Sequence, residues 1–202
     1  MRRKGAPWLL AGALLLLLAL GLTGKYLWTA RQAGRRAASA AAAVADAIAQ
    51  AQDAGAADAL PDYLLNPQMD MPELTLSGAR YIGLLEIPAL GLQLPVQRDW
   101  ESGDLDTAPC RYAGSAYLDN LVLCGHNYPG HFRPLLQAAP GMGVTFTDVD
   151  GNQFCYTVAA VERLGAGDVD EMISGGWALT LFTCTPGGAM REAVRCVQAA
   201  GA

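Results

Sequence analysis

The feature that most constrains this chain is an uninterrupted apolar run near its N-terminus. The 18 residues from Pro7 to Gly24 carry no charge, which is about the length that crosses ~30 Å of hydrocarbon. Trp8 lies at one end of this run, and Tyr26 and Trp28 follow the other end. Because Trp and Tyr favour the two membrane interfaces, the run predicts a transmembrane helix.

Basic residues before the run predict its orientation. Arg2, Arg3 and Lys4 precede it, and basic flanks favour the cytoplasmic side. A cleaved signal peptide is the alternative, since residues 38–40 (Ala-Ser-Ala) are small. That site lies well past the apolar run, however, and four basic residues intervene. We therefore favour an uncleaved, single-pass anchor in the cell membrane, with a cytoplasmic N-terminus and an extracellular body.

Charge and composition divide the rest of the chain. Residues 1–36 hold seven Lys and Arg and no acid, whereas residues 37–202 hold seven Arg and all 19 acids. A body with this acidic balance repels phosphate backbones, so we expect no nucleic-acid partner. We divide the chain into a basic terminus and membrane anchor (1–36), an Ala-rich helical stalk with a Pro-containing connector (37–78), and a folded body (79–202).

The stalk is predicted from its alanines. Residues 37–60 contain 14 Ala, which gives strong helix propensity with only a thin apolar stripe. We expect a semi-rigid helix that lifts the body off the membrane. Pro61, Pro67 and Pro72 then interrupt any helix, so residues 61–78 are expected to be an extended connector or a strap across the body.

The body has the pattern of a β-protein. Strands are expected at residues 81–87, 91–96, 120–124, 144–147, 153–158, 177–182 and 193–197. Residues 148–152 contain Asp-Gly between two alternating segments, which favours a hairpin. Short helices are expected at 132–137 and 169–173. Many short, closely spaced strands predict an all-β barrel or sandwich.

Two side chains at predicted strand ends are candidates for catalysis. His126 directly follows the strand 120–124, and Cys184 ends another strand before the open turn 185–188. A nucleophilic Cys with a His elsewhere in the chain is a recognised catalytic pair. Arg191 and Arg195 follow shortly after, and an Arg near a Cys can donate hydrogen bonds to an oxyanion. No Asp or Asn at a fixed spacing offers a third member.

The remaining His and Cys residues are interpreted as structural. His131 lies in a turn that enters a helix and is expected to be solvated. Cys124, Cys155 and Cys196 lie in apolar strands, where Cys commonly acts as a small buried hydrophobe. The five cysteines contain no C-x-x-C pair, so we expect no zinc site.

Several of these motifs, in their order along the chain, resemble those of sortases. Residues 180–186 (Thr-Leu-Phe-Thr-Cys-Thr-Pro), with an Arg seven residues after the Cys, resemble the sortase Cys–Arg motif. Residues 125–127 (Gly-His-Asn) resemble the His segment, and residues 81–88 resemble the opening strand of that fold. The resemblance covers about residues 80–198.

The resemblance implies a closed eight-stranded sortase-type β-barrel and a cysteine transpeptidase on a Gram-positive-type cell surface. It implies that Cys184 is the nucleophile, His126 the general acid/base and Arg191, rather than Arg195, the stabiliser of the oxyanion or substrate carbonyl. The implied partners are a surface-protein sorting peptide of the Leu-Pro-x-Thr-Gly kind and an amine acceptor from cell-wall precursor or a pilin-like protein. It requires no cofactor or metal; the acidic residues Asp148 and Asp150 are interpreted as part of a hairpin turn.

Two other functions remain open at this stage. Water in place of an amine would make the chain a membrane-anchored cysteine protease, and a non-catalytic extracytoplasmic β-domain would make it a binding module. The subclass is also open, because features typical of class B sortases (Gly-His-Asn) and of class C sortases (Thr-Cys-Thr-Pro) occur together. Whether residues 61–78 form a lid over the site of Cys184 and His126 is also open.

Overall fold

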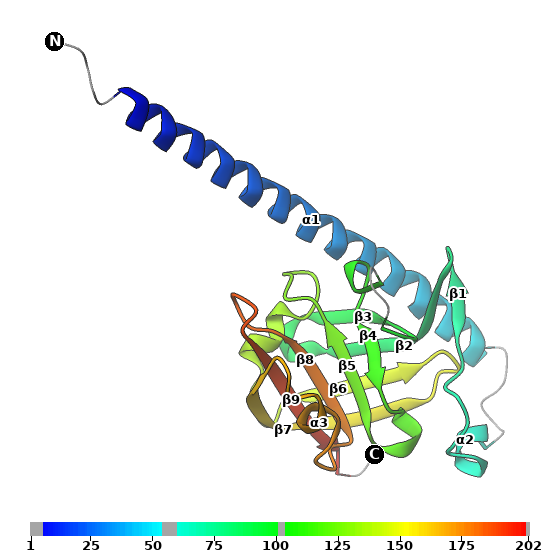
Figure 1. Ribbon diagram of the computed structural model, residues 1–202. Coiled ribbons are helices and arrows are strands. Elements are labelled where there is room, and N and C mark those ends of the chain that lie inside the picture. The colour runs from blue at the N-terminus through cyan, green and yellow to red at the C-terminus, as the bar shows by residue number, and fades with distance from the viewer. Residues whose placement is uncertain (1–5, 54–59, 101–103, 201–202) are drawn as a thin grey trace.

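The computed structural model describes residues 6–53, 60–100 and 104–200. It consists of a long N-terminal helix and a β-barrel against which the second half of that helix lies (Figure 1). Arg2, Arg3 and Lys4, on which the predicted orientation rests, lie outside the described residues.

Eight strands form a closed barrel, as predicted. Their hydrogen-bonded order is β2 (Ala79–Ile87), β3 (Leu92–Gln97), β4 (Cys110–Ala113), β5 (Leu121–Gly125), β8 (Leu179–Cys184), β9 (Met190–Gln198), β7 (Gln153–Gly165) and β6 (Gly143–Asp148). Pairing of β6 with β2 closes the barrel, which leaves no free edge between them. A short additional strand, β1 (Leu74–Leu76), pairs with the start of β2.

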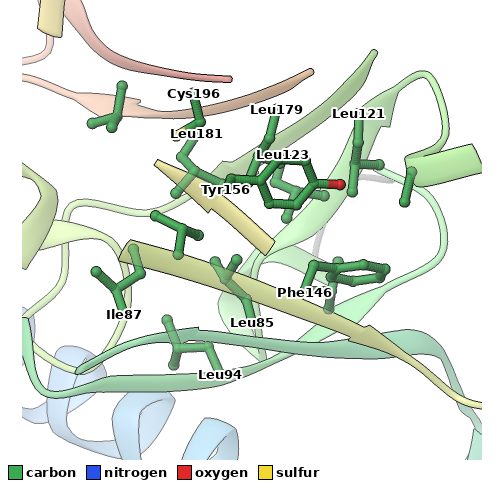
Figure 2. Packing of buried hydrophobic residues seen from close by; sticks show 14 of the residues in the cluster. Leu85, Ile87, Leu94, Leu121, Leu123, Phe146, Tyr156, Leu179, Leu181 and Cys196 are labelled. Atoms are coloured by element: carbon green, nitrogen blue, oxygen red, sulfur yellow. The ribbon is translucent and has the colours of Figure 1, made fainter. Parts of the chain in front are cut away.

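Large apolar side chains from every part of the barrel fill its interior. Leu85, Leu123, Phe146 and Leu181 are fully buried, and they point toward one another in Figure 2. On β5 the alternate residue Val122 faces outward, yet it is also buried, because Met172 of helix α3 (Val169–Ile173) covers it. Cover on both faces explains why β5 is apolar throughout rather than alternating.

The N-terminal helix α1 runs without a break from Ala6 to Asp53. It contains the one segment, among the residues that the structure describes, that is long and apolar enough to cross a membrane, with a mean hydropathy of 2.0 and no burial in the protein. Figure 1 shows this first half of α1 standing clear of the barrel. The expected anchor and the expected Ala-rich helix are therefore parts of one continuous helix.

The Ala-rich half of this helix, expected as a stalk, does not stand free of the body. Its second half packs on the outside of the barrel, along β2 and β3 (Figure 1). The buried side chains on this face are Ala30, Ala33, Ala37, Ala41, Val44 and Ile48. Their spacing of three or four residues places them on one helix face, and their small size lets the helix backbone approach closely. At Gly34 the approach is so close that a Cβ would lie 3.2 Å from the Cα of Gly130.

The connector after α1 is a strap at one end of the barrel. It contains a one-turn helix, α2 (Asp62–Leu65), before β1. The ring of Tyr63 stacks on that of Tyr117, with centroids 4.5 Å apart. Tyr117 belongs to the 3-10 helix η4 (Ala116–Leu118), which leads into the first residue of β5. The strap therefore covers the end of the barrel at which β5 begins.

The predicted hairpin joins β6 and β7. The carboxylate of Asp148 is fully buried and accepts hydrogen bonds from the backbone N–H groups of Asp150 and Asn152, from the Asn152 side chain and from the Tyr117 hydroxyl. These donors compensate for removing the charged carboxylate from water. Both oxygens of the Asp148 carboxylate are thus occupied by hydrogen bonds that shape the turn.

Candidate active site

The register of three neighbouring strands brings His126, Cys184 and Arg191 together. Strands β5 and β8 run parallel, with Gly125 beside Thr183. The next residues along the two strands are His126 and Cys184. Strands β8 and β9 run antiparallel, and Cys184 lies directly opposite Arg191. Residues directly opposite in an antiparallel pair have Cβ atoms about 5 Å apart, so thiol and guanidinium share one face of the sheet.

Buried contacts fix this end of β5 to its surroundings. The Thr183 hydroxyl donates a 2.8 Å hydrogen bond to the carbonyl oxygen of Gly125 and so ties β8 to β5 one residue before the two candidate side chains. Gly125 is required here by packing, because a Cβ would lie 2.8 Å from the ring of Phe132. The Phe132 N–H donates to the carbonyl of His126. The backbone that carries His126 is therefore held on both sides.

The three side chains line one cavity of about 270 Å³. Cys184 is half-buried, so its sulfur is neither sealed in the core nor fully solvated. The wall beside it contains three aromatic rings: Tyr112 packs edge-to-face on Phe182 and also contacts Trp100. No residue of the connector 60–78 lines this cavity, which opens at the end of the barrel opposite the strap. The connector is therefore not a lid over Cys184.

A carboxylate that we did not predict from the sequence lies beside the imidazole. Oδ1 of Asp106, at the end of the 3-10 helix η3 (Asp104–Asp106), is 3.2 Å from Nε2 of His126. The ring of His126 also packs against Tyr128, with centroids 4.7 Å apart. A carboxylate at this distance from the ring nitrogen restrains the orientation of the imidazole. Asp106 lies 20 residues before His126, and no local pattern marked it.

The two arginines lie in different surroundings. Arg195 is 2% exposed, and its guanidinium donates to the carbonyls of Glu171 and Met172, to the Thr180 hydroxyl and to the Glu162 carboxylate. These bonds hold the segment that contains α3 against β8 and β9. The guanidinium of Arg191 instead donates, among the residues that the structure describes, to two carbonyls, those of Gly188 and Met190, and Arg191 lines the cavity.

The other cysteines lie in environments that suppress reactivity or away from the cavity. All five are free thiols. Cys124 also lines the cavity, but burial raises the pKa of its thiol to about 12, and burial raises the pKa of Cys196 to about 12 as well. A thiol with so high a pKa forms little of the nucleophilic thiolate. Cys155 lies on β7 near the strapped end of the barrel.

His131 differs from the expectation of a solvated turn residue. It is fully buried, beside the backbone carbonyls of Ala33 in α1 and Thr107. Neither ring nitrogen makes a hydrogen bond of good geometry within the described residues. Burial lowers the pKa of His131 to about 4, and the two nearby carbonyls oppose the shift only in part. The turn is covered by α1, which local sequence around His131 does not reveal.

Comparison with known proteins identifies the family. Residues 85–200, more than half of the chain, match the family model of the sortase domain. The chain therefore belongs to the sortase family. A comparison with curated protein sequences finds no match.

Solved sortase structures share the fold. Sortase C1 from Streptococcus agalactiae is 22% identical, with a TM-score of 0.55 over 72% of this chain and 79% of that one. Sortase C from Clostridium perfringens SM101 is 21% identical, with a TM-score of 0.52 over 79% of this chain and 89% of that one. A lid mutant of sortase A from Corynebacterium diphtheriae is 20% identical, with a TM-score of 0.53 over 80% and 94%.

Proposed function

We propose that this chain is a membrane-anchored cysteine transpeptidase that cleaves a C-terminal sorting motif of a surface protein and joins the new end to an amine. The observation that carries the proposal is the meeting of Cys184, His126 and Arg191 in one cavity. These are the side chains that the family resemblance assigns to nucleophile, general acid/base and oxyanion stabiliser. The rival function as a binding module leaves this meeting unexplained.

In the proposed reaction the Cys184 thiolate attacks the carbonyl carbon of the scissile peptide bond, and a C–S bond forms. The carbonyl oxygen takes up the negative charge and accepts hydrogen bonds from the Arg191 guanidinium. When the intermediate collapses, the C–N bond breaks, and protonated His126 gives its proton to the departing amine. Asp106 holds the imidazole in place. A second amine then attacks the thioester carbon and gives a proton to the now neutral His126; the new C–N bond forms, the C–S bond breaks and the Cys184 thiolate is released. One difficult exchange thus becomes two easier steps.

Arg191 is preferred over Arg195 for the oxyanion because its guanidinium is available to a ligand. Arg195 is itself buried, and its bonds to the carbonyls of Glu171 and Met172 and to the Thr180 hydroxyl occupy it in fixing α3. The bonds of Arg191 to the carbonyls of Gly188 and Met190 both come from Nη1, and the residue lines the cavity.

The proposed substrate is a peptide of the Leu-Pro-x-Thr-Gly kind, and the proposed acceptor is an amine of cell-wall precursor or of a pilin-like protein. The rings of Trp100, Tyr112 and Phe182 offer an apolar wall for side chains of the motif. The apolar half of α1 supports anchoring in the cell membrane, and we propose a cytoplasmic N-terminus and an extracellular barrel.

Mass spectrometry of the full chain in detergent tests this function. Wild-type protein is incubated with a sorting-motif peptide, with and without an amine acceptor such as triglycine. We expect a thioester adduct on Cys184 and a joined product that requires the acceptor. Cys184→Ala should abolish both, whereas Cys155→Ala, which removes another half-buried thiol, should leave both unchanged. Hydrolysed peptide alone would indicate a protease, and intact peptide throughout would favour the binding module.

A further inference from the structure

A basic groove lies between α1 and the barrel, close to the end of the apolar span. It has a volume of about 540 Å³ and is lined by α1 residues from Tyr26 to Ala38 and by residues 129, 130 and 133 of the body. Three arginines, Arg31, Arg35 and Arg133, border it, and no acid does. None of the three forms an ion pair within residues 6–53, 60–100 and 104–200.

One end of the groove, at Tyr26, lies at the height of the lipid headgroups if α1 spans the membrane as proposed. With 1.5 Å of rise per residue, Tyr26 lies about 3 Å, Arg31 about 10 Å and Arg35 about 16 Å beyond Gly24, the last residue of the apolar run. The headgroup region of one leaflet is roughly 5–8 Å thick. Helical side chains lean toward the helix N-terminus, so Arg31 and Arg35 lean toward the bilayer.

Arg133, from the body of the protein, reaches the part of α1 that directly follows the apolar run. Its Nη2 donates to the hydroxyl of Tyr26 at 3.5 Å, and its Nε donates to Oδ1 of Asn127 at 3.3 Å. The guanidinium from the barrel therefore lies beside the first turn of α1 after the apolar run. Leu27 and Ala30 add apolar surface to the same groove, as a ligand with both a charged group and a hydrocarbon part requires.

We propose that this groove binds the phosphodiester headgroup of an anionic phospholipid in the leaflet that the barrel faces. Three unpaired guanidinium groups around one groove repel one another and attract an anion, and guanidinium forks match phosphate oxygens. Arg31 and Arg35 follow the span on the proposed extracellular side. They do not help to set this orientation, because the positive-inside rule favours basic residues on the cytoplasmic side. A bound anionic lipid gives them a partner.

The site is connected to the catalytic cavity by direct contacts. Tyr26 packs edge-to-face on Tyr128, with centroids 5.9 Å apart, and Tyr128 packs on His126. Arg133 bonds Asn127, the neighbour of His126. A lipid held by Arg133 would thus fix the segment that carries His126 with respect to the membrane surface. This inference rests on the proposed membrane anchoring, but not on the proposed transpeptidation.

Native mass spectrometry of the full chain in an uncharged detergent tests the proposal. The protein is titrated with phosphatidylglycerol and, separately, with zwitterionic phosphatidylcholine of the same acyl chains. We expect bound phosphatidylglycerol at concentrations that give little bound phosphatidylcholine. Each Arg near a membrane surface contributes about fivefold to the affinity for anionic lipid, so Arg31→Gln and Arg35→Gln should each weaken binding about fivefold.

Arg36→Gln is the matched control, because Arg36 lies on the same helix with the same charge but does not line the groove. It should leave binding unchanged; an equal loss in Arg36→Gln would mean diffuse charge attraction and would overturn the site. Equal binding of both lipids would also overturn it. So would displacement of phosphatidylglycerol by an equal concentration of inorganic phosphate, which would identify a simple anion site. Peptide cleavage is measured separately without added lipid, so a failure of the proposed chemistry is distinguishable from a failure of lipid binding.

Discussion

We expect His131 to make the protein less stable in mild acid, because its burial lowers the pKa of its ring. The pKa of His131 is about 4 in the folded protein against about 6.5 in an unfolded chain. The unfolded chain therefore takes up the proton first as the pH falls below 6.5, and the folded state loses stability. Between about pH 7 and about pH 5 this loss amounts to about 2 kcal/mol, and it levels off below about pH 4.

The assay compares the pH dependence of stability in wild type and in His131→Gln. Urea unfolding of the full chain in detergent gives the free energy of unfolding at each pH. His126 and Asp106, which also act on the His131 ring, are present in both proteins, so the difference in slope isolates His131. We expect wild type to lose about 2 kcal/mol more than the variant from pH 7 to pH 5. His131→Leu, which fills the same apolar site, provides a second test; parallel pH profiles in all three proteins would refute the reasoning.

Three further predictions concern the cavity. Arg191→Ala should lower kcat/KM for a sorting-motif peptide on the order of 10²–10³-fold, as loss of an oxyanion donor does; the exposed Arg163→Ala is the control, and an equal loss there would contradict the assignment. Asp106→Asn should lower kcat on the order of tenfold, because the neutral amide does not stabilise the imidazolium; an unchanged kcat would show that the contact is incidental. Thr183→Val should lower the free energy of unfolding by about 1 kcal/mol and reduce turnover; stability equal to wild type in urea unfolding would mean that its bond to Gly125 contributes nothing.

Sequence patterns predicted an all-β body and marked candidate catalytic side chains, and the family resemblance added the closed barrel. Alternating strands and the Asp-Gly turn predicted β6 and β7, and the strand-end positions of His126 and Cys184 marked both residues. The juxtaposition itself depends on the parallel pairing of β5 with β8. These strands are 58 residues apart in the chain, and local patterns do not encode such a pairing. Only the family resemblance implied that the three side chains meet.

The features that the sequence did not predict all depend on contacts between segments that are distant in the chain. Strand β4 is only four residues long and contains Arg111, so its pattern is weak. Strand β7 continues seven residues past the predicted end at Val158, because β9 offers it a partner as far as Gly165. Asp106 and His131 acquire their roles from a loop and from α1, each distant in sequence from what it contacts.

The unbroken α1 helix has a mechanical consequence. The helix packs on the barrel from Ala30 to Ile48 and continues without a break into the proposed bilayer span. No loop therefore separates the proposed span from the part of the helix that is fixed to the barrel. Under the proposed function, the height of Cys184 above the membrane surface is then fixed by the structure. A substrate anchored in the same membrane must then place its scissile bond at that height. We therefore expect the length of chain between its membrane anchor and its scissile bond to vary little among substrates.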